Sequence, residues 1–161
     1  MRWIILLYRE MKCSDYDEIY ELWNSIEGFA IRHVDDSRDG IERFIKRNPK
    51  TSIVAISEGK IVGTILCGHD GRNGSFYHVC VDKKYRKKGV GSNMVEYATE
   101  ALRAEGISKI SLIAFVQNEI GNAFWKHLEW KGVKNINYYE HVLNDDNTIK
   151  IIGKEYRDER S

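Results

Sequence analysis

Several features that mark particular classes of protein are scarce in this sequence. It has one proline, Pro49, and no Gly/Ser-rich or repetitive stretch, so we expect a single domain over residues 1–161. Its three cysteines are odd in number and lack C-x-x-C spacing, which favours reduced thiols in a cytoplasmic protein over disulfides or a zinc site. The formal net charge is only +1, which gives no general electrostatic reason to expect nucleic acid or membrane as a partner.

Long apolar runs are also missing. No stretch approaches the ~20 apolar residues that a membrane span needs. The short apolar run at residues 3–8 is followed at once by Arg9 and Glu10 and has no small-residue cleavage site. We therefore expect an edge strand there rather than a signal peptide.

Two common phosphate-binding patterns are absent. The P-loop pattern G-x-x-x-x-G-K-[ST] does not occur, and G-x-G-x-x-G fails because Met94 stands where its third glycine would be. A basic, glycine-containing turn at residues 86–91 is present instead, between an expected strand at 76–81 and an expected helix from Val90. The first amides of a helix lack partners within it, so this turn predicts a phosphate or pyrophosphate site. A solvated basic turn is the alternative.

The hydrophobic pattern predicts an α+β or mixed α/β fold. We expect strands at 3–9, 51–57, 61–67, 76–81, 109–116, 133–142 and 148–153, and helices at 14–26, about 37–48, 90–102 and 119–130. The last of three meandering strands, at 76–81, also begins a strand–helix–strand crossover. Ser14 can cap the first helix, Asn118 is a good N-cap for the last helix, and residues 28–36 are expected to form a loop.

Two motifs at this separation resemble the GNAT superfamily of N-acetyltransferases. Arg86-x-x-Gly89-x-Gly91 is similar to its [QR]-x-x-G-x-[GA] acetyl-CoA loop, and Asn118-x-x-Gly121-x-x-Phe124-Trp125 is similar to its N-x-x-A-x-x-F-Y motif. The strict resemblance covers residues 76–131. It implies a GNAT-like central mixed β-sheet flanked by about four helices. It also implies an enzyme that moves acetyl from acetyl-CoA to a primary amine, by direct attack in a ternary complex and without a metal.

The resemblance also implies which residues bind acetyl-CoA. They come from the strand, the turn and the second motif: Val79, Cys80, Val81, Arg86, Lys87, Lys88, Gly89, Val90, Gly91, Ser92, Asn118, Gly121, Phe124 and Trp125. In the family a backbone amide of the strand polarises the thioester carbonyl, and we assign that role to Val81.

Trp125 departs from the family pattern, which has there a tyrosine that protonates the leaving thiolate. An indole N–H donates a hydrogen bond but does not give up its proton near neutrality. Three interpretations stay open. Solvent or cofactor geometry suffices; another acid such as Tyr138, Tyr139 or Cys80 substitutes, with Tyr139 preferred; or the chain is a non-catalytic acyl-CoA-binding or sensor domain.

The base candidates are Glu27, His78, Asp35 and Asp36. His78 has the pKa class that suits a base near pH 7, although an ordinary strand histidine is the alternative. The histidines show no metal-ligand spacing.

Glu27, Phe29, Asp35 and Asp36 lie where the family commonly builds its acceptor site. They predict a small-molecule or peptide amine as substrate, with a merely solvated acidic loop as the alternative. We expect no nucleic-acid or membrane partner, and a homodimer is the assembly to test.

Overall fold

The computed structural model describes residues 3–155. Within this range the chain forms four α-helices, seven strands and two short 3-10 helices. The helices are α1 Tyr16–Asn24, α2 Arg38–Arg47, α3 Val90–Ala104 and α4 Glu119–His127. The strands are β1 Leu6–Glu10, β2 Ala30–Arg32, β3 Ile53–Ser57, β4 Lys60–His69, β5 Gly74–Val81, β6 Ile110–Ser111 and β7 Ile149–Ile151.

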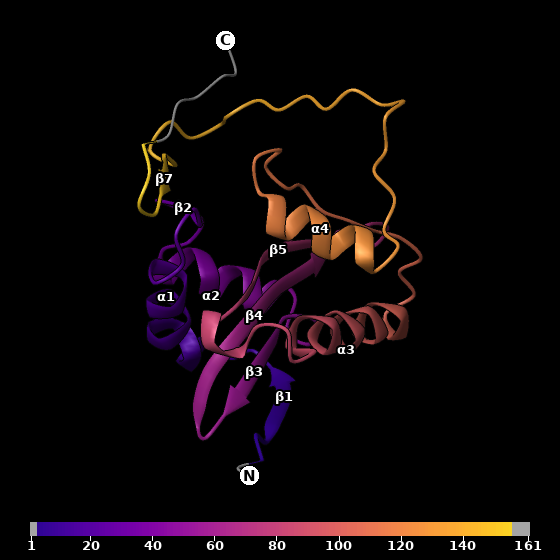
Figure 1. The fold of residues 1–161 in the computed structure, drawn as a ribbon. Helices are drawn as coiled ribbons and strands as arrows, with labels where there is room; N and C mark the ends of the chain where they lie inside the picture. The colour runs from indigo at the N-terminus through magenta and orange to yellow at the C-terminus, as the bar shows by residue number, and fades with distance from the viewer. Residues whose placement is uncertain (1–2, 156–161) are drawn as a thin grey trace.

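Five strands form one mixed sheet in the order β1-β3-β4-β5-β6. The neighbours from β1 to β5 are antiparallel, and β6 runs parallel to β5. Helices α1 and α2 cover one face of the sheet and α3 covers the other (Figure 1). This arrangement confirms the predicted α+β class with a helix-flanked central mixed sheet.

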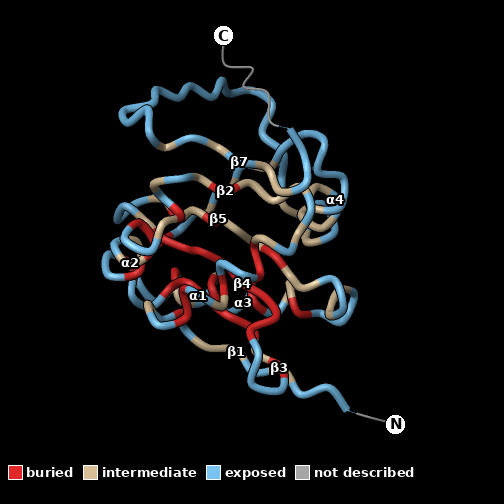
Figure 2. The backbone as a smooth tube through the Cα atoms, turned by 90° about the vertical axis from the view of Figure 1, so that its left-hand side faces the viewer, coloured by how far each residue is buried: buried red, intermediate tan, exposed pale blue. Residues whose placement is uncertain are grey.

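The core has two parts, one on each face of the sheet. Along β3, Val54 packs into the cluster built with α1 and α2, whereas Ile53 and Ala55 pack into the cluster built with α3. Successive strand residues point to opposite faces, so a strand covered on both sides is apolar throughout. Figure 2 shows the buried backbone concentrated in these central strands and the helix faces against them.

The start of α1 differs from the expectation that Ser14 caps it. A 3-10 turn at Cys13–Asp15 precedes the helix. The Asp15 carboxylate accepts a hydrogen bond from the Lys12 amide at 2.8 Å and two from the Arg9 guanidinium, each at 2.8 Å. The longer Asp15 side chain therefore holds the turn in place of a serine hydroxyl.

This ion pair gives a pH-dependent prediction. Burial alone would raise the pKa of Asp15, but the hydrogen bonds from Arg9 and from the Lys12 amide outweigh it and lower the pKa. A carboxyl with a lowered folded-state pKa adds stability above its unfolded pKa, and this is lost as the pH falls through the folded pKa. We expect Arg9→Met to lower the free energy of unfolding at pH 7 by about 1 kcal/mol, because Arg9 is partly exposed and screened. In urea titrations, the difference in free energy of unfolding between Arg9→Met and the wild type should shrink below about pH 4. A difference that does not change with pH would contradict this prediction.

The far edge of the sheet is shorter than expected. The predicted strand at 109–116 forms only as β6, which pairs with β5 at Gly74 and Ser75 alone. From Phe76 onward the edge of β5 that faces away from β4 therefore has no pairing with β6. The two strands separate toward the end of β5 where the sequence predicted the active site.

The C-terminal region corrects a second expectation. Residues 133–142, predicted as a strand, form none, and all of residues 131–146 are exposed. The predicted strand at 148–153 forms as β7, and it pairs antiparallel with β2, inside what was expected to be a loop at 28–36. A strand forms by pairing with a neighbouring strand; β7 pairs with β2, whereas residues 133–142 belong to neither sheet of residues 3–155.

Candidate active site

The turn between β5 and α3 exposes backbone amides at the start of a helix. Lys87 and Gly89 adopt positive φ angles of 61° and 79°, which bends the chain into α3. The first hydrogen bond of the helix runs from the Asn93 amide to the Gly89 carbonyl at 3.0 Å. The amides of residues 90–92 precede it and so lack a partner within the helix. Together with the helix dipole, these donors suit a phosphate or diphosphate group.

Five cationic side chains surround this turn: Lys83, Lys84, Arg86, Lys87 and Lys88. The four lysines are exposed, whereas Arg86 is half-buried and its Nε donates to the Val81 carbonyl at 3.3 Å. This charge adds to the attraction for an anion, so the residues present fit the predicted cofactor. The arginine contact also fixes the turn to the end of β5.

The two glycines of the turn differ in role. A Cβ on Gly89 would meet only the side-chain Nδ2 of Asn93, at 4.0 Å, so space does not require a glycine there. The left-handed φ of residue 89 does favour glycine. A Cβ on Gly91 would lie 3.2 Å from two ring carbons of Phe124. Gly91 therefore allows α3 to approach α4 closely, a packing role that the motif alone did not reveal.

The backbone of β5 presents Val81 at the open edge. The Asp82 amide donates to the Val62 carbonyl of β4 at 2.7 Å. Because backbone groups of successive strand residues point to opposite edges, the Val81 amide points away from β4. The Val81 carbonyl, which accepts from Arg86, lies on the same side. Val81 thus presents its amide beside the turn of α3.

A bulge in β5 sets the position of His78. Thr64 pairs with Cys80 and Leu66 with Tyr77, so His78 and Val79 together face one residue of β4. His78 has a positive φ of 48°, unusual for a residue other than glycine. The Trp23 indole donates to the Thr64 hydroxyl at 3.0 Å, and that hydroxyl donates to the His78 carbonyl at 2.8 Å. Buried hydrogen bonds therefore hold the bulge.

The His78 ring contacts a buried carboxylate. Its Nε2 lies 2.7 Å from Oδ1 of Asp36, and the two side chains are 16% and 4% exposed. The ring also stacks obliquely against Trp23 and Phe29, with centroids 4.6 and 4.8 Å apart. An ionised Asp36 carboxylate accepts a hydrogen bond from Nε2–H, which leaves Nδ1 as the nitrogen with a free lone pair. This arrangement can orient an imidazole for proton transfer.

The acidic residues of the 27–36 region divide into two kinds. Asp36 is buried, and its Oδ2 also accepts from the Arg32 amide at 2.7 Å, so it is committed to the protein rather than to solvent. Glu27 and Asp35 are exposed. Asp35 accepts a hydrogen bond at 2.9 Å from Asn147, a residue just before β7. The C-terminal strand therefore fixes this region to β2.

Helix α4 places the second motif against α3 and β5. The Asn118 side chain caps the helix by accepting from the Gly121 amide at 3.0 Å. A Cβ on Gly121 would lie 2.4 Å from that side chain, which explains the glycine. Trp125 packs among the rings of Phe76, Phe124 and Trp130 at centroid distances of 6.2, 4.9 and 4.7 Å. Trp125 is thus part of an aromatic cluster.

The alternative acids have unfavourable surroundings. Burial raises the pKa of the Cys80 thiol to about 11, which makes it a weaker acid than a free thiol. Tyr138 donates its hydroxyl proton to Glu140 at 3.0 Å. Tyr139 is 85% exposed on the segment between α4 and β7.

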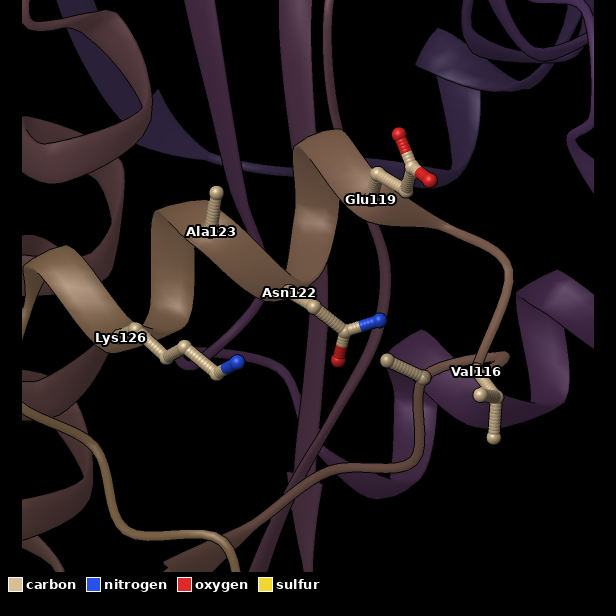
Figure 3. Close-up of a pocket in the computed structure, with 6 residues that line it drawn as sticks. Val116, Glu119, Asn122, Ala123 and Lys126 are labelled. Atoms are coloured by element: carbon tan, nitrogen blue, oxygen red, sulfur yellow. The ribbon is translucent and has the colours of Figure 1, made fainter.

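A cavity of about 460 Å³ lies on a different face of α4. It is lined by Ala114, Val116, Glu119, Asn122, Ala123 and Lys126. In Figure 3 Asn122 and Lys126 point to one side of α4, toward the segment that carries Val116. The helix turns Phe124 and Trp125 into the core instead. This open cavity therefore does not include the turn or His78.

Neither a candidate metal site nor a membrane-spanning helix is present within residues 3–155. No group of three or more histidine, cysteine or acidic side chains there is placed to hold a metal ion. No helix in that range is long and apolar enough to cross a bilayer.

The sequence did not reveal the partner of His78. Asp36 lies 42 positions earlier and was grouped with its acidic neighbours. In the sequence, Asp36 differs from its acidic neighbours only in preceding the Ser37 N-cap of α2. In the structure, its backbone carbonyl accepts a hydrogen bond from the buried Tyr16 hydroxyl at 2.7 Å. Such a contact between distant segments depends on how the helices pack.

Several known proteins resemble this chain in sequence or in fold. An acetyltransferase of Pectobacterium atrosepticum is 27% identical over 137 residues, covering 85% of this chain and 96% of the relative. One of Sodalis glossinidius is 28% identical over 123 residues, covering 76% and 85%. An aminoglycoside N-acetyltransferase solved with CoA shares the fold, with a TM-score of 0.66, 16% identity, and coverage of 87% and 97%.

The family assignment rests on a family model. The model described as the acetyltransferase (GNAT) family matches residues 16–130, from the start of α1 to just beyond α4. This range contains β5, the turn of α3 and the second motif. The chain belongs to the GNAT family of acetyltransferases.

Proposed function

We propose that the chain transfers the acetyl group of acetyl-CoA to a primary amine, by direct attack while both substrates are bound. The observation that carries this proposal is the arrangement along β5. His78 lies at the bulge with Asp36 on its Nε2, Val81 presents its amide three residues later, and the anion-binding turn of α3 follows. A proton acceptor, an oxyanion donor and a phosphate site would therefore succeed one another along β5 and the turn that follows it.

The chain's own groups would bind and orient the cofactor. Acetyl-CoA supplies the acetyl group as a thioester and a thiol as leaving group. The amides of residues 90–92 would accept its diphosphate, with Arg86 and the neighbouring lysines adding charge. The Val81 amide would stabilise negative charge on the thioester oxygen, a contribution that is typically worth roughly 10²–10³ in rate. Support comes from the family assignment and from the structural relative that was solved with CoA.

His78 would remove the proton from the amine. Asp36 holds Nε2 as a donor, so Nδ1 is the atom that accepts the proton. We propose that no protein acid protonates the leaving thiolate, because a free thiol pKa near ~8.5 already makes it a tolerable leaving group. Trp125, Cys80 and the exposed Tyr139 then take no part in proton transfer.

The acceptor would enter beside the region 27–36. Phe29 stacks on the His78 ring and offers an apolar surface, while Glu27 and Asp35 are exposed carboxylates nearby in the chain. These groups suit an ammonium group attached to a carbon chain. One structural relative, an aminoglycoside acetyltransferase, was solved with the bisubstrate analog CoA-S-monomethyl-acetylneamine (TM-score 0.64, 14% identity). It supports a small-molecule amine as the class to test first.

A two-step experiment tests this function. Calorimetry with acetyl-CoA should show saturable binding, and pooled cationic amines should then release free thiol from acetyl-CoA. Absence of acetyl-CoA binding would contradict the proposal outright. Binding without thiol release from any amine pool would favour a non-catalytic acyl-CoA sensor, the alternative that the Trp125 substitution supports.

Neighbouring aspartates provide a matched pair of variants. Asp36→Asn should lower kcat by roughly 10²–10⁴, because an amide nitrogen facing Nε2 would favour the tautomer with the proton on Nδ1 and remove the base. Asp35→Asn should leave kcat unchanged and raise only the KM for a cationic amine, by a small, salt-sensitive factor. Steady-state kinetics on both variants distinguish the roles. Equal effects of the two substitutions on kcat would contradict the assignment of Asp36.

A further inference from the structure

One buried hydroxyl group on β4 contacts both α1 and the bulge of β5. Thr64 has an exposed fraction of 0%. Its Oγ1 lies 3.0 Å from the indole nitrogen of Trp23, 2.8 Å from the carbonyl oxygen of His78 and 3.2 Å from the sulfur of Cys80. Thr64 lies outside both sequence motifs, so this link between the three elements comes from the structure alone.

These three contacts fix the direction of the hydroxyl proton of Thr64. A hydroxyl has one proton to donate and two lone pairs with which to accept. An indole N–H only donates and a carbonyl oxygen only accepts, so Trp23 occupies one lone pair and the His78 carbonyl receives the proton. The second lone pair faces the Cys80 thiol, which is therefore the donor in that contact. The hydroxyl is fully satisfied, and its single proton is committed to the bulge.

The backbone that receives this proton has an unfavourable conformation. His78 has a φ of 48°, in the left-handed region, which costs energy for a residue with a side chain and persists only where the surroundings enforce it. A bulge re-aims the side chain that it carries, so the conformation of residue 78 decides where the imidazole lies. In this position Nε2 lies 2.7 Å from Asp36 Oδ1. A relaxed backbone at residue 78 would turn the ring away from that carboxylate.

We propose that Thr64 is a positioning residue for His78, an inference that rests on the proposed function of His78 as the base. Its hydroxyl holds the His78 carbonyl, so the bulge keeps Nε2 on Asp36 and leaves Nδ1 free for the proton of the amine. Trp23 supports this arrangement in two ways, because it donates to Thr64 and its ring lies 4.6 Å from the imidazole. Thr64 is itself buried and acts through His78.

Valine and serine variants separate the hydroxyl from the shape of the side chain. Thr64→Val keeps a β-branched side chain of similar size but has no proton for the His78 carbonyl. We expect kcat to fall about 10- to 100-fold, because a small misplacement of a catalytic group has an effect of this order, with the KM for acetyl-CoA unchanged. Thr64→Ala should show the same loss without any crowding. Thr64→Ser keeps the hydroxyl and should restore kcat, and a serine variant as slow as the valine variant would overturn the proposal.

Thr51→Val is the matched control for the loss of a buried hydroxyl. Thr51 is also 0% exposed, and its hydroxyl donates to another carbonyl of β4, that of Cys67, at 2.5 Å. The substitution removes the same kind of hydrogen bond from the core without removing a donor to the bulge. We expect both valine variants to lower the melting temperature and only Thr64→Val to lower kcat. Equal losses of kcat would mean that reduced stability explains both, which would contradict the proposal.

A double variant shows whether Thr64 acts through His78. Adding Thr64→Val to His78→Gln should cause no further loss of kcat, because the base is already absent. A further loss as large as that in the wild-type background would assign Thr64 a role independent of His78 and would overturn the proposal.

The imidazole also provides a readout that needs no turnover. Nitrogen-15 NMR under mildly alkaline conditions should show the His78 ring as the Nε2–H tautomer in the wild type and in Thr64→Ser, and as a mixture of tautomers in Thr64→Val. The spectrum of His78→Gln identifies the signals. An unchanged tautomer in Thr64→Val would contradict the positioning role. A chain that shows the expected tautomers but acetylates no amine would support the positioning of the ring and contradict the proposed function alone.

Discussion

Replacement of His78 by glutamine is expected to lower kcat by roughly 10²–10⁴ and to leave the KM for acetyl-CoA unchanged. The glutamine amide can still donate to the Asp36 carboxylate, whose Oδ1 lies 2.7 Å from Nε2 in the wild type, so the buried acid keeps a partner. It cannot accept a proton near neutrality. The loss therefore reports on proton removal rather than on folding or cofactor binding.

The control for this variant is His127→Gln. His127 is exposed at the end of α4 and should tolerate the change without effect on either constant. Thermal unfolding of both variants establishes whether the fold is intact. A His78→Gln enzyme with wild-type kcat and a normal melting curve would remove His78 from the mechanism.

The second large effect is expected at the first turn of α3. Ser92→Glu should weaken acetyl-CoA binding by about 100-fold, because a carboxylate beside the amides of residues 90–92 would repel the diphosphate. An acidic residue in the first turn of a helix is favourable for the helix dipole, so stability should not fall. Position 92 is preferable to position 91, where a side chain would meet Phe124.

Ser92→Gln separates charge from size. It has nearly the same shape as the glutamate variant without the negative charge, so we expect a loss of only a few-fold. Calorimetric titration with acetyl-CoA gives both affinities, and melting temperatures show whether α3 is intact. Equal affinities of the two variants would mean that no diphosphate binds at this helix start.

Local patterns carried the fold-level predictions. The aromatic and β-branched run at 76–81 predicted β5, the helical spacing from Val90 predicted α3, and Asn118 caps α4 as expected. Glu58 and Gly59 form the turn between β3 and β4 with φ angles of 51° and 76°. Each of these features depends on residues close together in the chain.

Contacts between segments that are far apart in the chain could not be predicted from the sequence. The His78–Asp36 pair depends on how α2 packs against β5, and the role of Gly91 depends on the approach of Phe124. A strand was predicted at 133–142, but strand formation also requires a neighbouring strand, and these residues belong to neither sheet of the described structure. The short β2 has too few residues to produce a pattern, and it exists because β7 pairs with it.

The most direct test of the central claim follows the acetyl group itself. Acetyl-CoA with an isotopic label in the acetyl carbonyl is incubated with the wild-type chain and a pool of primary amines, and mass spectrometry locates the label. We expect the label in an amide of a cationic amine, with an equal amount of free thiol, and neither product from the His78→Gln variant above background. Label that remains in acetyl-CoA, or that appears only as acetate, would contradict amine acetylation by this chain.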